Sequence, residues 1–182
     1  MVRFRTHSWA LILCTLALAL LSSCMTPPEE KLRLAAAEGN FLRVETFLRE
    51  RINPQAADER GATPLLLAAK NGHRDVVALL LEQGAAVDSA RQDGVTPLLI
   101  AVQEGRRDMV ALLLEKGANV NAQARMGSVT PLHVGAFRGN QAIVTLLLQH
   151  GADKNARMSS GERPVDLAQT QGHEALIPLL EP

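Results

Sequence analysis

The chain has 182 residues, enough for one domain with a hydrophobic interior, and its content of 47% hydrophobic and 21% charged residues argues against a disordered protein. Lys and Arg total 19, as do Asp and Glu, so the sequence predicts no basic surface for nucleic acid. Both cysteines, Cys14 and Cys24, lie near the amino terminus, which excludes a disulfide or a thiolate metal site from the rest of the chain.

The first 23 residues have the layout of a secretory signal peptide. Arg3 and Arg5 precede the apolar stretch WALILCTLALALL (9–21), and no acidic residue interrupts them. A membrane-spanning helix needs about 20 apolar residues, whereas this stretch ends at Ser22. We therefore expect residues 1–23 to target the protein for export and not to span the membrane.

The tetrapeptide LSSC (21–24) resembles the lipobox of bacterial lipoproteins. This resemblance implies that Cys24 is diacylated and becomes the new amino terminus, because acyl chains hold a protein durably at a membrane. Met25 follows in place of an Asp retention signal, which favours the inner leaflet of the outer membrane, facing the periplasm. The alternative is a plain secretory signal with an incidental cysteine.

Beyond the cysteine, one pattern recurs with a period of 33 or 34 residues. Segments that restate it begin at Gly61, Gly94 and Gly127, and a weaker copy begins at Gly161. A second series of glycines follows the same period: Gly39, Gly72, Gly105, Gly139 and Gly172. Self-similarity of this kind predicts stacked repeats. The copy from Gly127 contains one additional residue, at Ser128-Val129.

Each repeat predicts two short helices. Thr63 can cap the first helix, Pro64 suits its first position, and Gly72 suits its end because glycine tolerates a left-handed backbone. A second helix is expected from His73 or Arg74 to near Gly84. The expected packing side of the first helix consists of Leu65, Leu67, Ala68 and Ala69.

These motifs resemble the ankyrin repeat. They include Thr63-Pro64-Leu65, Thr96-Pro97-Leu98, Thr130-Pro131-Leu132-His133, Gly72-His73 and the helix ending LLEKGANVN (113–121). The resemblance implies an all-α solenoid with projecting turns and about five helix pairs, two of them caps and three regular. The expected units span approximately 26–57, 58–90, 91–123, 124–157 and 158–182, within a domain of 24–182.

The terminal units depart from the pattern as caps do. Glu30-Lys31 and Arg163-Pro164 replace Thr-Pro, and Arg51 replaces the glycine after the second helix. TPPE (26–29) fits a capping box, so the first helix could start two residues after the lipid. A flexible proline-rich linker is the alternative.

The sequence gives no sign of catalysis. It lacks the motifs of zinc proteases, serine hydrolases and phosphate-binding loops, and it contains no tyrosine. The histidines beyond the signal peptide, His73, His133, His150 and His173, are interpreted as structural. We therefore expect no enzymatic activity, no metal and no cofactor.

The resemblance places partner contacts on the concave face, at the turns and before the interhelix glycines. Carried over to this sequence, the positions are Arg60, Lys70, Asn71, Gln92, Asp93, Gln103, Glu104, Arg125, Met126, Phe137 and Arg138. Phe137 is aromatic where the other regular repeats are polar, so we place the centre of the site at Arg125, Met126, Phe137 and Arg138. Alternatively, Phe137 covers a neighbouring repeat.

The sequence thus predicts a non-catalytic protein-binding module, monomeric and lipid-anchored in a bacterial envelope. Three alternatives remain open at this point: an accessory or protective partner of an envelope enzyme or toxin, an enzyme with a site in the repeats, and a structural protein at the membrane.

Overall fold

The computed structural model describes residues 26–181. The predicted signal peptide and the predicted lipidation site at Cys24 lie outside the described residues.

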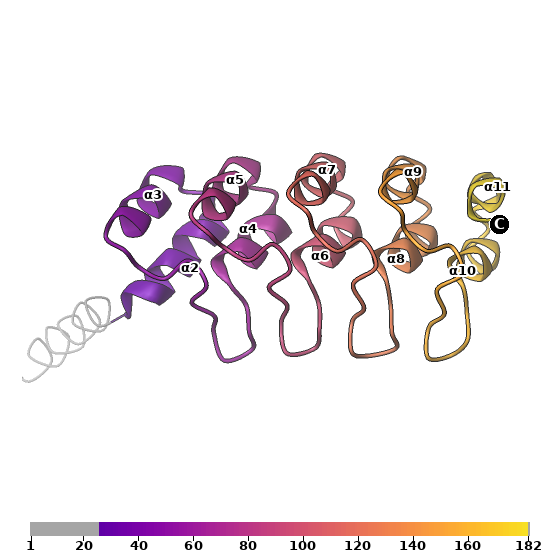
Figure 1. The fold of residues 1–182 in the computed structure, drawn as a ribbon, viewed down its shortest axis with the longest axis horizontal. Coiled ribbons are helices and arrows are strands. Elements are labelled where there is room, and N and C mark those ends of the chain that lie inside the picture. The colour runs from indigo at the N-terminus through magenta and orange to yellow at the C-terminus, as the bar shows by residue number, and fades with distance from the viewer. Residues whose placement is uncertain (1–25, 182) are drawn as a thin grey trace, which may run out of the picture.

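The described residues form ten α-helices and one short 3₁₀ helix, without a strand. The first helices of the pairs are α2 (Pro28–Glu38), α4 (Pro64–Asn71), α6 (Pro97–Gln103), α8 (Pro131–Arg138) and α10 (Pro164–Thr170). The second helices are α3 (Phe41–Arg49), α5 (Arg74–Glu82), α7 (Arg107–Glu115), α9 (Gln141–Gln149) and, after the 3₁₀ helix Glu174–Leu176, α11 (Ile177–Leu180). Figure 1 shows two parallel rows of helices, with the turns projecting from the row of first helices. The predicted all-α solenoid of five helix pairs is confirmed.

The first helices begin and end as their local sequence predicts. The hydroxyls of Thr63 and Thr96 accept hydrogen bonds from the amides three residues later, and a proline occupies the next position. Gly72 closes α4 with φ +86°, which a residue with a Cβ adopts only under strain. These starts and stops depend on neighbouring residues alone.

One hydrophobic core runs through the stack, from Leu32 in α2 to Leu180 in α11. Leu65, Leu98 and Leu132 occupy equivalent positions in consecutive first helices, and all three side chains are fully buried. Each repeat therefore covers the apolar faces of its neighbours.

The predicted packing side of α4 left out Leu66, while Leu67 packs as predicted, against a small cluster. Leu66 is buried, whereas Leu67 is only partly buried. Leu66 forms a second, smaller cluster with Ala62 and Ile100 beside the turns. Because each inner first helix lies between two others and a turn, more than one stripe of its surface is covered.

The first unit is polar at one position that is apolar in the inner repeats, although Leu34, Phe41 and Leu42 are also exposed there. Arg43 occupies the position that Val76 and Met109 hold in the next repeats, where these apolar side chains are buried. The Arg43 guanidinium is exposed and lies 3.8 Å from the Glu38 carboxylate. The predicted capping box is wrong, since the N-cap of α2 is Pro27, which makes no side-chain capping bond.

The last unit replaces the threonine cap by an ion pair. Asp166 accepts from the Arg163 guanidinium (3.1 Å) and from the Arg163 amide (2.8 Å), and these contacts hold the pKa of Asp166 below its usual range. The carboxylate therefore accepts from the N-cap amide, whereas the Asp166 amide, equivalent to the one that bonds to the threonine hydroxyl in α4 and α6, donates to the Arg163 carbonyl (3.1 Å).

Side chains that follow the interhelix glycines connect successive repeats. His73 Nε2 lies 3.0 Å from the carbonyl oxygen of Ala37, and His173 Nε2 lies 3.1 Å from that of Phe137. The Arg106 guanidinium donates to the Lys70 carbonyl in the same way (2.9 Å). Asn140 instead caps its own helix at Ile143 (3.1 Å). Two of the four histidines in residues 26–181 thus hold neighbouring repeats together.

His133 makes a further connection from a fully buried position. Its Nδ1 lies 2.8 Å from the Thr130 hydroxyl and accepts from the Thr130 amide (3.3 Å), while Nε2 lies 3.2 Å from the Glu162 carbonyl. The neutral ring with a proton on Nε2 satisfies all three contacts, since a protonated Nδ1 would face an N–H donor. Burial accordingly lowers the pKa of His133 below 6.5.

This arrangement predicts a loss of stability in mild acid. The unfolded chain binds a proton at His133 below about pH 6.5, whereas the folded protein resists protonation, so the free energy of unfolding falls from that pH towards the lowered pKa. His133→Leu, which copies Leu66 and Leu99 of the preceding repeats, is expected to lose less stability between about pH 7.5 and about pH 5. Thermal unfolding at several pH values measures the difference, and equal losses in both proteins would contradict this role.

Candidate functional site

The turn tips form a continuous row along one side of the solenoid (Figure 1). Backbone hydrogen bonds join neighbouring tips: Gln92 donates to the Arg60 carbonyl (3.1 Å), Arg125 to that of Asp93 (2.8 Å), and Ser159 to that of Gly127 (2.9 Å). The turns and the first helices behind them therefore present one connected surface.

In two of the turns, a carboxylate accepts hydrogen bonds from backbone amides of the same turn. Asp58 accepts from the amides of Ala62 (2.8 Å) and Arg60 (2.9 Å), and the bond from Ala62 is the main reason that the pKa of Asp58 lies below its usual range. Asp93 accepts from the Val95 amide (3.2 Å) and pairs with Arg91 (2.6 Å). A surface held in this way loses little conformational entropy on binding.

The turn before α8 is longer than the others. Its closing bond runs from the Ala124 amide to the Val129 carbonyl, one residue more than the bond from Asp58 to Ala62. Ser128 adopts φ +52°, a left-handed conformation that is uncommon outside glycine. The additional residue lies at the tip, where the Met126 side chain is 79% exposed.

Most of the expected partner-binding residues are exposed. They are Arg60, Lys70, Asn71, Gln92, Gln103, Glu104, Arg125, Met126, Phe137 and Arg138, whereas Asp93 is half-buried. Three of the expected residues also stabilise the fold. The side-chain amide of Asn71 donates to the Ala37 carbonyl (2.7 Å), and the side-chain amide of Gln92 donates to the Glu59 carbonyl (2.7 Å). The Asp93 carboxylate accepts a hydrogen bond within its own turn. These three have fewer polar atoms free for a partner.

An apolar hollow of about 340 Å³ opens between α6, α8 and α10. We define it by its lining residues, Gln103, Val129, His133, Val134, Phe137, Arg138, Met158 and Leu167. The hollow brings together three residues expected from the sequence: Gln103, Phe137 and Arg138. Arg125 and Met126 do not line it and lie at the neighbouring turn tip.

Sequence reasoning missed Val134, Met158 and Leu167 in this site. Val134 and Leu167 hold the repeat position of Leu67 and Ile100, which the pattern assigns to packing. The sequence does carry one signal for them. In the next repeat the charged Glu162 holds the position of the apolar Val95, which indicates that Val134 and Leu167 are less well covered.

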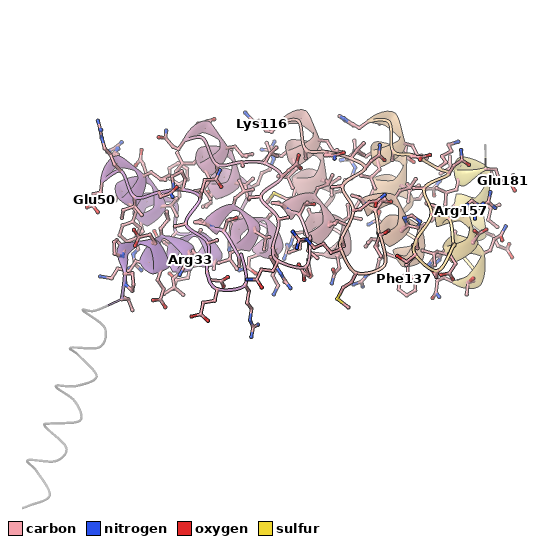
Figure 2. All side chains as sticks on the ribbon, turned by 60° about the horizontal axis from the view of Figure 1, so that its bottom comes forward. Arg33, Glu50, Lys116, Phe137, Arg157 and Glu181 are labelled. Carbon is pink, nitrogen blue, oxygen red and sulfur yellow. The ribbon has the colours of Figure 1, made fainter. Side chains whose placement is uncertain are left out.

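Phe137 lies at the rim of the hollow and is 49% exposed. Figure 2 shows its ring pointing away from the body of the protein, on the side opposite Lys116. The equivalent positions in the neighbouring repeats hold Lys70, Gln103 and Thr170. Half of the aromatic surface is therefore available for contact with another molecule.

Two larger hollows involve the second helices and interhelix loops, and their linings are mostly charged or polar. One, of about 420 Å³, includes Arg74, Glu104 and Asp108, and the other, of about 510 Å³, includes Arg107, Gln141 and Gln149. The apolar hollow differs from both because its walls are mostly apolar.

Within residues 26–181, no cluster of three or more His, Cys, Asp or Glu side chains is arranged to hold a metal ion. The helices of this part of the chain are all too short or too polar to cross a membrane.

Comparison with protein families agrees with the repeat pattern. Residues 32–124 match a model of three ankyrin repeats, and residues 129–159 match a model of a single ankyrin repeat. The gap between the matches contains the longer turn at Ser128. The chain matches no curated protein sequence.

Proposed function

Because this chain belongs to the ankyrin-repeat family, whose members are generally non-catalytic interaction modules, we propose that it binds a protein partner on its concave face and is anchored by lipid on Cys24. The proposed location is the inner leaflet of a bacterial outer membrane, facing the periplasm.

The observation that carries the binding proposal is the apolar hollow beside the half-exposed Phe137. Exposed apolar surface costs free energy in water, and aromatic and arginine side chains are enriched in binding interfaces. The neighbouring turns are already ordered by hydrogen bonds. This face can therefore hold a partner without first reorganising its backbone.

The anchoring proposal is supported by the order of basic residues, apolar stretch and LSSC in the first 24 residues. Helix α2 begins at Pro28, so at most about 14 Å of extended chain separates the helix from Cys24. Such a tether would keep the first repeat close to the membrane surface.

We expect Cys24→Ala to abolish incorporation of labelled palmitate into the protein when it is expressed in a bacterial host. The thiol of Cys24 is the proposed attachment atom, whereas Cys14 lies within the apolar stretch and is expected to be dispensable. Cys14→Ala is therefore the matched control and is expected to stay labelled. A labelled Cys24→Ala protein, or an unlabelled wild type, would refute the anchor.

The binding proposal is tested by affinity capture from envelope extracts with residues 25–182. A partner held by the wild type is expected to be lost when Arg125, Phe137 and Arg138 are all changed to alanine, because each truncation at the centre of an interface costs about 1–4 kcal/mol. The control is Lys116→Ala, an exposed cation on the opposite side of the protein (Figure 2). Equal capture of the same partner by all three proteins would rule out the concave face.

A further inference from the structure

The apolar hollow is the open counterpart of a cluster that is closed elsewhere in the same protein. Between α4 and α6, Ala62, Leu66 and Ile100 are buried, and Leu67 and Val95 pack against them. At that junction three apolar side chains are buried and two more cover them in part.

The equivalent five positions between α8 and α10 hold different residues. In the same order they are Val129, His133, Leu167, Val134 and Glu162. Four of them line the hollow, whereas Glu162, which replaces Val95, is exposed. The Glu162 carboxylate accepts a hydrogen bond from Ser160 in its own turn (2.6 Å), and Glu162 is not one of the residues that line the hollow. Two of the five apolar side chains are thus replaced, Leu66 by the buried His133 and Val95 by the exposed Glu162.

The rim of the hollow adds a charge. Arg138 ends α8 and is exposed, and no carboxylate lies within 4 Å of its guanidinium in the described part of the chain. The same holds for Arg125 at the neighbouring turn tip. Glu162 places a negative charge at the turn end of the hollow, away from the carboxyl end of α8, and the exposed Glu104 follows the lining residue Gln103.

The volume limits what can enter. At about 340 Å³ the hollow is near the lower limit for small-molecule sites, and it is open on one side. It suits one or two apolar side chains together with a short length of backbone.

We propose that the hollow receives a single large apolar side chain from an extended segment of the partner, and that a carboxylate adjacent to that side chain pairs with Arg138. The inserted side chain takes the place that Val95 fills at the earlier junction. This inference rests on the proposed function, since it specifies the chemistry of the partner bound at that face.

The probe is a library of random linear peptides displayed on phage, selected against immobilised residues 25–182, which include every described residue of the core. Enriched peptides are expected to carry Leu, Ile, Met or Phe with Asp or Glu within a few positions. Enrichment without an acidic preference, or no enrichment, would overturn the proposal.

Two variants test the two halves of the site separately. Arg138→Glu is expected to lower the affinity of a selected peptide about tenfold or more and to shift selection towards Lys and Arg. Glu162→Val restores the missing apolar side chain, so it is expected to close the hollow and abolish selection while preserving the fold. Lys116→Glu is the matched charge reversal away from the site and is expected to leave binding unchanged.

Thermal unfolding of each variant establishes that the fold is intact. A selected peptide that binds Arg138→Glu or Glu162→Val as tightly as the wild type would exclude the proposed pairing or the proposed insertion. Partner capture separates the two proposals. If the partner is captured through the concave face but the peptide selection fails, only the proposed insertion of an apolar side chain is refuted. Capture that is insensitive to the concave face refutes the proposed function itself.

Discussion

Leu98→Ala is expected to lower the free energy of unfolding by about 2–5 kcal/mol. Leu98 is fully buried in α6, which packs against α4 on one side and α8 on the other. Removing most of this side chain takes apolar contacts from two repeat interfaces at once. In a solenoid, stability is a sum of repeat and interface terms, so a loss at the centre also weakens the coupling between the two halves.

Urea unfolding of residues 25–182 measures this loss. Leu42→Ala removes the same atoms from a side chain that is 72% exposed in α3, and it is expected to change stability by less than about 0.5 kcal/mol. A Leu98→Ala midpoint equal to that of Leu42→Ala would show that the central interface does not determine stability.

Gly94→Ala is expected to destabilise the protein by more than about 2 kcal/mol. Gly94 has φ +79°, and a Cβ built there lies 2.7 Å from the Arg125 backbone nitrogen. Because the Arg125 amide donates to the Asp93 carbonyl (2.8 Å), relief of this clash separates two neighbouring turn tips. The loss therefore combines backbone strain with a broken contact between repeats.

Gly84→Ala separates these two contributions. Gly84 has φ +86°, but no heavy atom lies within 4 Å of a Cβ at that position. Its replacement is expected to cost only the strain of a left-handed alanine, about 1–2 kcal/mol. Equal losses for Gly84→Ala and Gly94→Ala, measured by thermal unfolding, would show that the turn tips separate without cost.

The difference between interactions within a few residues and contacts with the next repeat explains which predictions succeeded. Thr63 and Pro64 start a helix, and Gly72 ends it, through interactions within a few residues, so the sequence alone predicted these boundaries. The prediction failed at Thr26, because the capping box motif does not establish which residue starts the helix; α2 begins at Pro28, with Pro27 as its N-cap.

The candidate site was only partly predictable for the same reason. Phe137 and Arg138 could be selected because they differ from their counterparts in the other repeats. The hollow beside them could not, since it results from the combined effect of Val134, Leu167 and Glu162, which come from two successive repeats.

The sequence by itself determined the repeat period, the helix boundaries of the regular units and the solenoid architecture, because capping, glycine conformation and apolar periodicity act over short distances. Only the tertiary structure decided which apolar side chains are covered. Leu67 packs against a buried cluster and Val134, at the same repeat position, lines an open hollow, because coverage depends on the volume and direction of the side chains that the next repeat supplies.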